Sequence, residues 1–257
     1  MELIKSVARR SQVSDIIYVT LNIALALAIL VMTVAFQPPI LAYLLVLLSK
    51  WRVFAVRPRF WWANLQTNMV DVLVGFSVVT LIWQASGALI AQILLAVLFV
   101  AWLLVIKPRS SRRYVVLQAG LAQFFALAAL FSGAHVFDSA IVVAICFLIG
   151  FVSARHVLTA YEDTHVTLLS AAWGFFLAEL GWLGYHWVVA YGIVENLMLP
   201  QIAIIAGLAG FVAIRFIDAA AHGHKLSSHL RAPMLFAGAV LAILLLRELS
   251  GIFNYTS

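Results

Sequence analysis

The chain has 257 residues, of which 65% are hydrophobic and 10% are charged, and its formal net charge is +6. Soluble proteins average roughly 45–50% apolar and about 25% charged residues, so this composition excludes an ordinary soluble domain. A single cysteine, Cys146, excludes an internal disulfide and a thiolate-rich metal or iron–sulfur site. The basic residues fall in short runs between apolar stretches instead of on one folded face, which argues against nucleic acid as a partner.

Apolar stretches close to the ~20 residues that cross the hydrocarbon core recur along the whole chain. We expect nine spans, at residues 16–36, 38–55, 67–86, 88–106, 115–133, 138–158, 166–191, 197–217 and 232–249. The predicted fold is an all-α polytopic transmembrane helical bundle, with a single membrane-embedded domain over 1–257 and a short basic segment at 1–15. The second span is the least regular, because its apolar run 40–48 is short and follows two prolines. A re-entrant hairpin is the alternative there.

The placement of charge predicts the orientation, since Lys and Arg accumulate in cytoplasmic loops. With nine crossings and the N-terminus inside, 15 of the 16 basic residues lie on the inner side, and Arg247 lies outside. If the second span did not cross, the basic runs would alternate between the two sides without a rule. We therefore expect a cytoplasmic N-terminus and an outside C-terminus in the plasma (inner) membrane. The expected partners are the lipid bilayer and, at the cytoplasmic basic loops, anionic lipid.

Glu179 is the most informative polar residue, because it lies near the centre of the predicted span 166–191. An ionised side chain there costs at least ~2.5 kcal/mol on insertion scales. Trp182 and His186 project from the same helical face, so the stripe is a candidate proton path or solute site. The alternative is a neutral Glu179 that hydrogen-bonds across a helix interface, with Gln123 at similar depth as its partner.

Asp71 lies about one turn inside the third predicted span, at its cytoplasmic end. Arg155 and Arg215 lie at matching depth in other spans, which predicts a structural ion pair in preference to a gate. On the eighth span, small residues at helical spacing predict a close-packing face; these are Ala203, Ala206, Gly207 and Gly210.

Two cytoplasmic loops contain imidazole and carboxylate groups, but neither has a helical spacing that presets metal geometry. These residues are His222, His224 and His229 in one loop, and Glu162, Asp163 and His165 in the other. We predict solvated loop residues and no metal site. Every lysine flanks a span and no phosphate-binding glycine loop occurs, so no cofactor is assigned.

Two functions stay open on these residues. The first is a small permease or a proton- or solute-linked transporter that uses Glu179 as its intramembrane carboxylate. The alternative is a non-catalytic scaffold or assembly subunit with partner membrane subunits, favoured by short loops and small-residue packing faces. An enzyme is less favoured, because the pairs Ser153 with His156 and Glu179 with His186 lack a third, orienting group.

Overall fold

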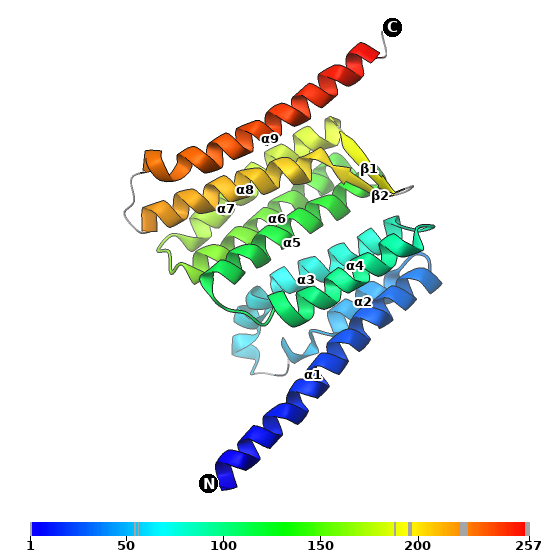
Figure 1. Cartoon of the computed structure of the whole chain (residues 1–257), viewed down its shortest axis with the longest axis vertical. Helices are drawn as coiled ribbons and strands as arrows, with labels where there is room; N and C mark the ends of the chain where they lie inside the picture. Colours follow the sequence, from blue (N-terminus) through cyan, green and yellow to red (C-terminus); the bar gives the residue numbers. More distant parts are fainter. Residues whose placement is uncertain are drawn as a thin grey trace.

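Helices make up most of the chain in the computed structural model (Figure 1). The structure describes residues 2–53, 55, 57–187, 189–194, 197–221 and 226–254. Side chains are described over the same ranges except at 2–12, 52, 221, 226–229 and 248–254. The side chains of most of the predicted basic segment 1–15, and those of the loop residues His222, His224 and His229, therefore lie outside the described residues.

Nine α-helices occur within the described residues. They are α1 (Glu2–Ala35), α2 (Ile40–Leu48), α3 (Trp61–Gln84), α4 (Leu89–Ala101), α5 (Arg112–Ser132), α6 (Ser139–Ala160), α7 (Val166–His186), α8 (Gln201–Ala221) and α9 (Leu226–Asn254). Short helical turns are η1 (Trp51–Val53), η2 (Pro58–Phe60), the π turn η3 (Trp102–Ile106) and η4 (Ala134–Val136). Strands β1 (Ala190–Val194) and β2 (Leu197–Pro200) form one antiparallel hairpin.

Eight of these helices are long and apolar enough to cross a membrane, which indicates an integral membrane protein. The exception is α2, whose 9 residues rise only about 14 Å against a hydrocarbon core of about 30 Å. The predicted second span, 38–55, is thus a short helix followed by the turn η1. In Figure 1 this segment still carries the chain back toward the end of the bundle where α3 begins.

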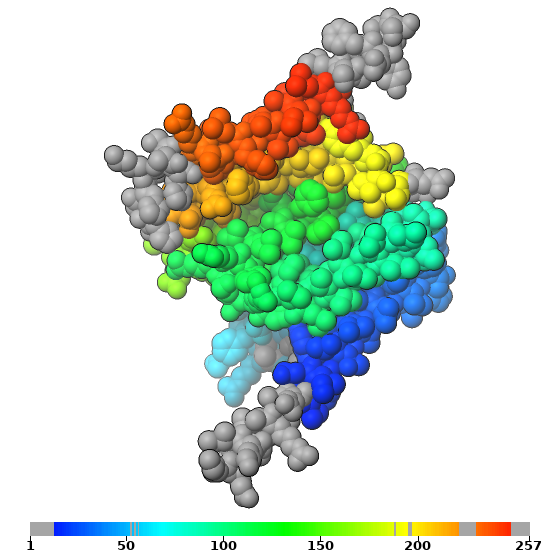
Figure 2. Space-filling view, in the orientation of Figure 1, coloured from blue at the N-terminus to red at the C-terminus, as the bar shows by residue number. Residues whose placement is uncertain are grey.

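Neighbouring helices run in alternating directions, and α1 and α9 lie at opposite edges of the bundle (Figure 1). One end of the bundle, called the basic end below, holds Lys50, Lys107, Arg112 and Arg155. The other, the hairpin end, holds β1 and β2, and there Arg247 lies over the ring of Tyr191 at 4.3 Å. In the space-filling view the helices form one continuous surface (Figure 2).

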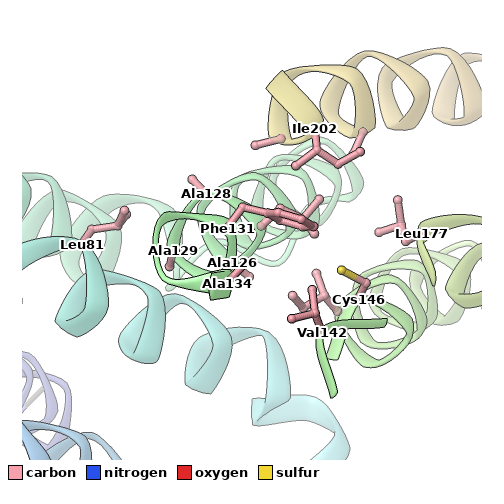
Figure 3. Close-up of a cluster of buried hydrophobic side chains, with 14 of the residues drawn as sticks. Leu81, Ala126, Ala128, Ala129, Phe131, Ala134, Val142, Cys146, Leu177 and Ile202 are labelled. Carbon is pink, nitrogen blue, oxygen red and sulfur yellow. The ribbon is translucent and has the colours of Figure 1, made fainter. Parts of the chain in front are cut away.

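Two apolar clusters hold the helices together. One joins α1 to α4 and includes Ile29, Val46, Val79 and Leu103. The other joins mainly α5 to α8 and the hairpin, with Phe131, Cys146, Leu177 and Ile202 contributed by four different helices (Figure 3). Large apolar side chains also cover the outside of the bundle, which in a membrane is the surface that contacts lipid.

Helices α6 and α7 approach each other through glycines. A Cβ atom added at Gly174 would lie 2.9 Å from the carbonyl oxygen of Phe147, and one at Gly181 would lie 2.5 Å from the Sγ atom of Cys146. A Cβ at Gly150 would lie 3.0 Å from the Cα atom of Gly174. Only a hydrogen in place of a side chain permits this spacing, as at other close membrane helix crossings.

The predicted packing face of α8 is present. Ala203 and Ala206 are fully buried, and the carbonyl oxygen of Ala206 accepts a hydrogen bond from Gln123 of α5 at 3.0 Å. A Cβ added at Gly210 would lie 3.5 Å from the amide nitrogen of the same Gln123. Small residues therefore place α8 close enough to α5 for a side chain to reach its backbone.

The predicted end of span 166–191 and the predicted start of span 197–217 are wrong, because Ala190–Val194 and Leu197–Pro200 are the paired strands of the hairpin. Helix α7 ends at His186, and α8 begins at Gln201, directly after Pro200. The backbone N–H of Gln201 donates to the carbonyl of Val189 at 2.8 Å, which closes the base of the hairpin. Paired strands satisfy the backbone here, so the apolar sequence does not need to be helical.

Candidate functional site

A buried cluster of charges lies at the basic end around Asp71 of α3. The carboxylate oxygen Oδ2 contacts the ammonium groups of both Lys50 and Lys107, the latter at 2.5 Å. The other oxygen, Oδ1, accepts a hydrogen bond from Trp102 Nε1 at 3.0 Å. Asp71 is only 7% exposed, so its carboxylate contacts groups of the protein and almost no solvent. The cluster ties the segment after α2 to α3 and α4.

The π turn η3 is what brings Trp102 and Lys107 to the same carboxylate. In an α-helix, residues five apart point about 140° away from each other. Here the backbone N–H of Lys107 donates to the carbonyl of Trp102 at 2.9 Å, so the two residues lie one wide turn apart on one side of the helix. The irregular turn at the end of α4 therefore has a local cause in the Asp71 cluster.

Polar side chains bind several carbonyl groups in this irregular turn and directly after it. Gln118 of α5 donates its amide N–H groups to the carbonyls of Ile106 and Arg109 at 2.8 and 2.9 Å. Its amide oxygen lies 3.0 Å from Nε2 of His156, and Tyr18 of α1 donates to a further carbonyl, that of Leu103. This network is a structural support for the end of α4.

The cationic partners of Asp71 differ from the two that the sequence predicts. Arg155 instead donates to Gln66 at 3.2 Å and to Thr167 at 3.3 Å, and Arg215 lies over the ring of Phe211 at 5.3 Å. The two lysines reach Asp71 because each sits just beyond a helix and its long side chain extends back along the bundle. The depth of a residue in the membrane therefore does not determine which cations face Asp71 on α3.

Gln123 is bonded inside the bundle and not to Glu179. It accepts a hydrogen bond from Nε1 of Trp173 at 2.8 Å and donates to the carbonyl of Ala206. The side chain, only slightly exposed, thereby joins α5, α7 and α8. This amide is a structural bridge between three helices, which is the common role of polar side chains in membrane bundles.

Glu179 lies on the outward face of α7, among apolar side chains. Residues that share this side of the helix are exposed; they are Leu168, Ala172, Phe175, Glu179, Trp182 and His186, called the Glu179 face below. The opposite side of α7 is buried through Ser170, Gly174, Leu177, Ala178 and Gly181. Since α7 ends at His186, Glu179 lies about 10 Å from the hairpin end, within the apolar part of the helix.

Trp182 and His186 interact with each other on this face. Their ring centroids are 4.7 Å apart, and Nδ1 of His186 lies 2.9 Å from the carbonyl oxygen of Trp182. Among the residues that the structure describes, the Glu179 carboxyl group has no hydrogen bond or ion pair. The three predicted residues thus share a face, but the imidazole does not bind the carboxyl group.

An apolar cavity of about 310 Å³ opens near the hairpin end between α5, α7, α8 and α9. Its wall includes Phe131, Leu183, Trp187, Ile202 and Leu245, and none of the described residues that line it carries a charged side chain. Neither Glu179 nor His186 lines it. The cavity suits a hydrocarbon chain better than an ion.

The predicted Ser153 and His156 pair is not joined in the structure. Ser153 Oγ is buried and has no hydrogen-bond partner among the described residues, while His156 contacts Gln118. In the second loop, Asp163 accepts a hydrogen bond from the backbone N–H of His165 at 2.7 Å. Within the described side chains, no group of three His, Cys, Asp or Glu residues is placed to hold a metal ion.

Comparisons of the chain with protein-family models, with curated proteins and with solved structures gave no match.

Proposed function

We propose that this chain is a non-catalytic subunit of a membrane assembly, and that it binds another membrane-spanning helix through the Glu179 face. The observation that carries this proposal is the outward position of Glu179 on α7. A carboxyl group that faces hydrocarbon is costly, since nothing there donates or accepts a hydrogen bond. A neighbouring helix with a matching polar group removes that cost and contributes about 1–2 kcal/mol of association.

The arrangement of the other polar groups favours assembly over the permease that the sequence first suggests. A permeation route needs polar groups that line a water-accessible path. Asp71, Gln118 and Gln123 instead form hydrogen bonds or ion pairs with groups of their own bundle. The apolar cavity near the hairpin end does not include Glu179. These contacts support a bundle whose inner polar groups are paired and whose Glu179 carboxyl group, unpaired among the described residues, faces outward.

The same proposal includes an orientation: the basic end faces the cytoplasm, with the N-terminus inside and the C-terminus outside. Support comes from the positive-inside rule, because the cations around Asp71 and those at the starts of α3 and α5 share one end. Lys107, Arg109 and Arg112 are the residues we propose to attract anionic lipid headgroups of the inner membrane leaflet.

The orientation predicts which loops a membrane-impermeant maleimide can reach in intact cells. In a Cys146→Ala background, Ile193→Cys in the exposed hairpin is expected to be labelled from outside. Thr164→Cys, in the exposed loop between α6 and α7, is expected to react only after the membrane is permeabilised. Labelling of Thr164→Cys alone in intact cells would reverse the proposed orientation.

Assembly predicts a neighbour at α7 in the native membrane. A photoreactive benzoylphenylalanine at Phe175, which is 65% exposed beside Glu179, is expected to give a protein adduct of higher mass. The matched control is Leu94 on α4, 57% exposed on an apolar face without a polar residue, which is expected to give none. Glu179→Leu is expected to remove the Phe175 adduct. A chain that gives no adduct at either position and purifies as a single partner-free species would exclude this function.

A further inference from the structure

The Glu179 face has the spacing of a helix-pairing seam. From Leu168 to His186 its residues follow one another at alternating steps of four and three, the repeat by which two helices pack side by side with a shallow crossing angle. Ala172 is small, so backbones can approach closely there. Phe175 and Trp182 lie one turn on either side of Glu179, at 65% and 49% exposed, and would enclose a polar contact between them.

Among the described side chains, no lysine or arginine pairs with Glu179. Arg155 and Arg215 lie within α6 and α8 but contact Gln66, Thr167 and Phe211, and the cations that contact the buried Asp71 are at the basic end. His186, the nearest imidazole on the seam, lies about 10 Å further along the helix axis and contacts Trp182. A partner that pairs with a protonated Glu179 must bring both a donor and an acceptor to its depth.

We propose that the occupant of the Glu179 face is a second copy of this chain, with the two α7 helices parallel around a two-fold axis normal to the membrane. This inference rests on the proposed function and names its partner. A two-fold axis places each residue opposite its own equivalent at the same depth. Two carboxyl groups then meet, each donating its O–H to the carbonyl oxygen of the other, so that both are satisfied without a net charge. Phe175 and Trp182 of both copies close around this pair.

Cysteine crosslinking in membranes tests the pairing. In the Cys146→Ala background, Phe175→Cys and Trp182→Cys are expected to form disulfide-linked dimers on mild oxidation. Leu94→Cys and Leu98→Cys, on the exposed face of α4, are the matched controls and are expected to stay monomeric. Adding Glu179→Leu is expected to lower the dimer fraction at positions 175 and 182 by about tenfold in the association constant. Glu179→Gln is expected to retain the dimer, because an amide also donates and accepts.

The outcomes separate this inference from the function on which it rests. The second copy is supported if dimers form at both positions 175 and 182, weaken with Glu179→Leu and persist with Glu179→Gln. If the α7 cysteines crosslink only to a different protein and never to each other, the second copy is excluded while an assembly role stands. If α7 crosslinks to nothing and Glu179→Leu changes neither partner content nor size in detergent, both proposals fail.

Discussion

Asp71→Asn is expected to destabilise the folded protein by about 3–5 kcal/mol, the range seen when one partner of a buried ion pair is removed. The Lys50 and Lys107 ammonium groups contact the same carboxylate oxygen of Asp71, so a neutral amide would leave the largely buried Lys50 and the half-buried Lys107 facing each other without a counter-charge. The hydrogen bond from Trp102 Nε1, which now ends on the charged carboxylate, would end on a neutral amide oxygen. Unfolding by SDS from mixed micelles, followed by tryptophan fluorescence, measures the effect.

Two further variants show whether charge is the cause. The triple variant Asp71→Leu with Lys50→Met and Lys107→Met removes all three charges and is expected to recover most of the loss, because apolar replacement of a buried ionic group is often neutral. Arg155→Met removes a cation at the same end whose partners are Gln66 and Thr167, and is expected to change stability by about 0.5 kcal/mol or less. If Arg155→Met destabilised the protein as much as Asp71→Asn, Arg155 would be the partner of Asp71, as the sequence predicts.

Gly174→Ala is expected to cost about 1–3 kcal/mol by overpacking the contact between α6 and α7. The added methyl group would meet the backbone oxygen of Phe147 at 2.9 Å, and a backbone atom has no other rotamer to adopt. Gly181→Ala is expected to be destabilising too, since its methyl group would lie 2.5 Å from Cys146 Sγ. Thermal unfolding in detergent, read by the loss of soluble monodisperse protein, compares the variants.

The two glycines differ in how they can be rescued. Cys146→Ala removes the sulfur atom and is expected to restore part of the loss in Gly181→Ala, but none in Gly174→Ala. Gly120→Ala on α5 is the matched control, because nothing lies within 4 Å of its added methyl group, and it is expected to be neutral or slightly stabilising. Equal stability of Gly174→Ala and Gly120→Ala would show that the helix contact is looser than described.

The helical class and most spans follow from the sequence because lipid leaves the backbone few other choices. The exceptions occur where that constraint relaxes. Ala190–Val194 and Leu197–Pro200 satisfy their backbone as the two strands of a hairpin, and the short helix α2 is followed by Lys50, whose charge is bound by Asp71. Neither contact is visible in local hydropathy, since each depends on a second segment of the chain.

The direction in which Glu179 points follows from the pattern of small residues on α7. Gly174, Ala178 and Gly181 are small residues that mark the side of α7 packed against the bundle, and Glu179 lies about 100–160° around the helix from them. The partners of Asp71 do not follow from such a pattern. In the sequence, Lys50 and Lys107 indicate only the orientation of the chain, and the π turn that directs Lys107 to Asp71 has no signature in composition.

The wide turn at the end of α4 also limits the length of that segment. Removing one residue between Trp102 and Lys107 would place the lysine four residues after the tryptophan, and ordinary α-helical winding would keep both on one side of the helix. Inserting one residue would instead place them six residues apart, about 120° apart around an α-helix, and would turn the lysine away from Asp71. The segment therefore has no room for a further residue, although it could lose one and keep the same charges in contact.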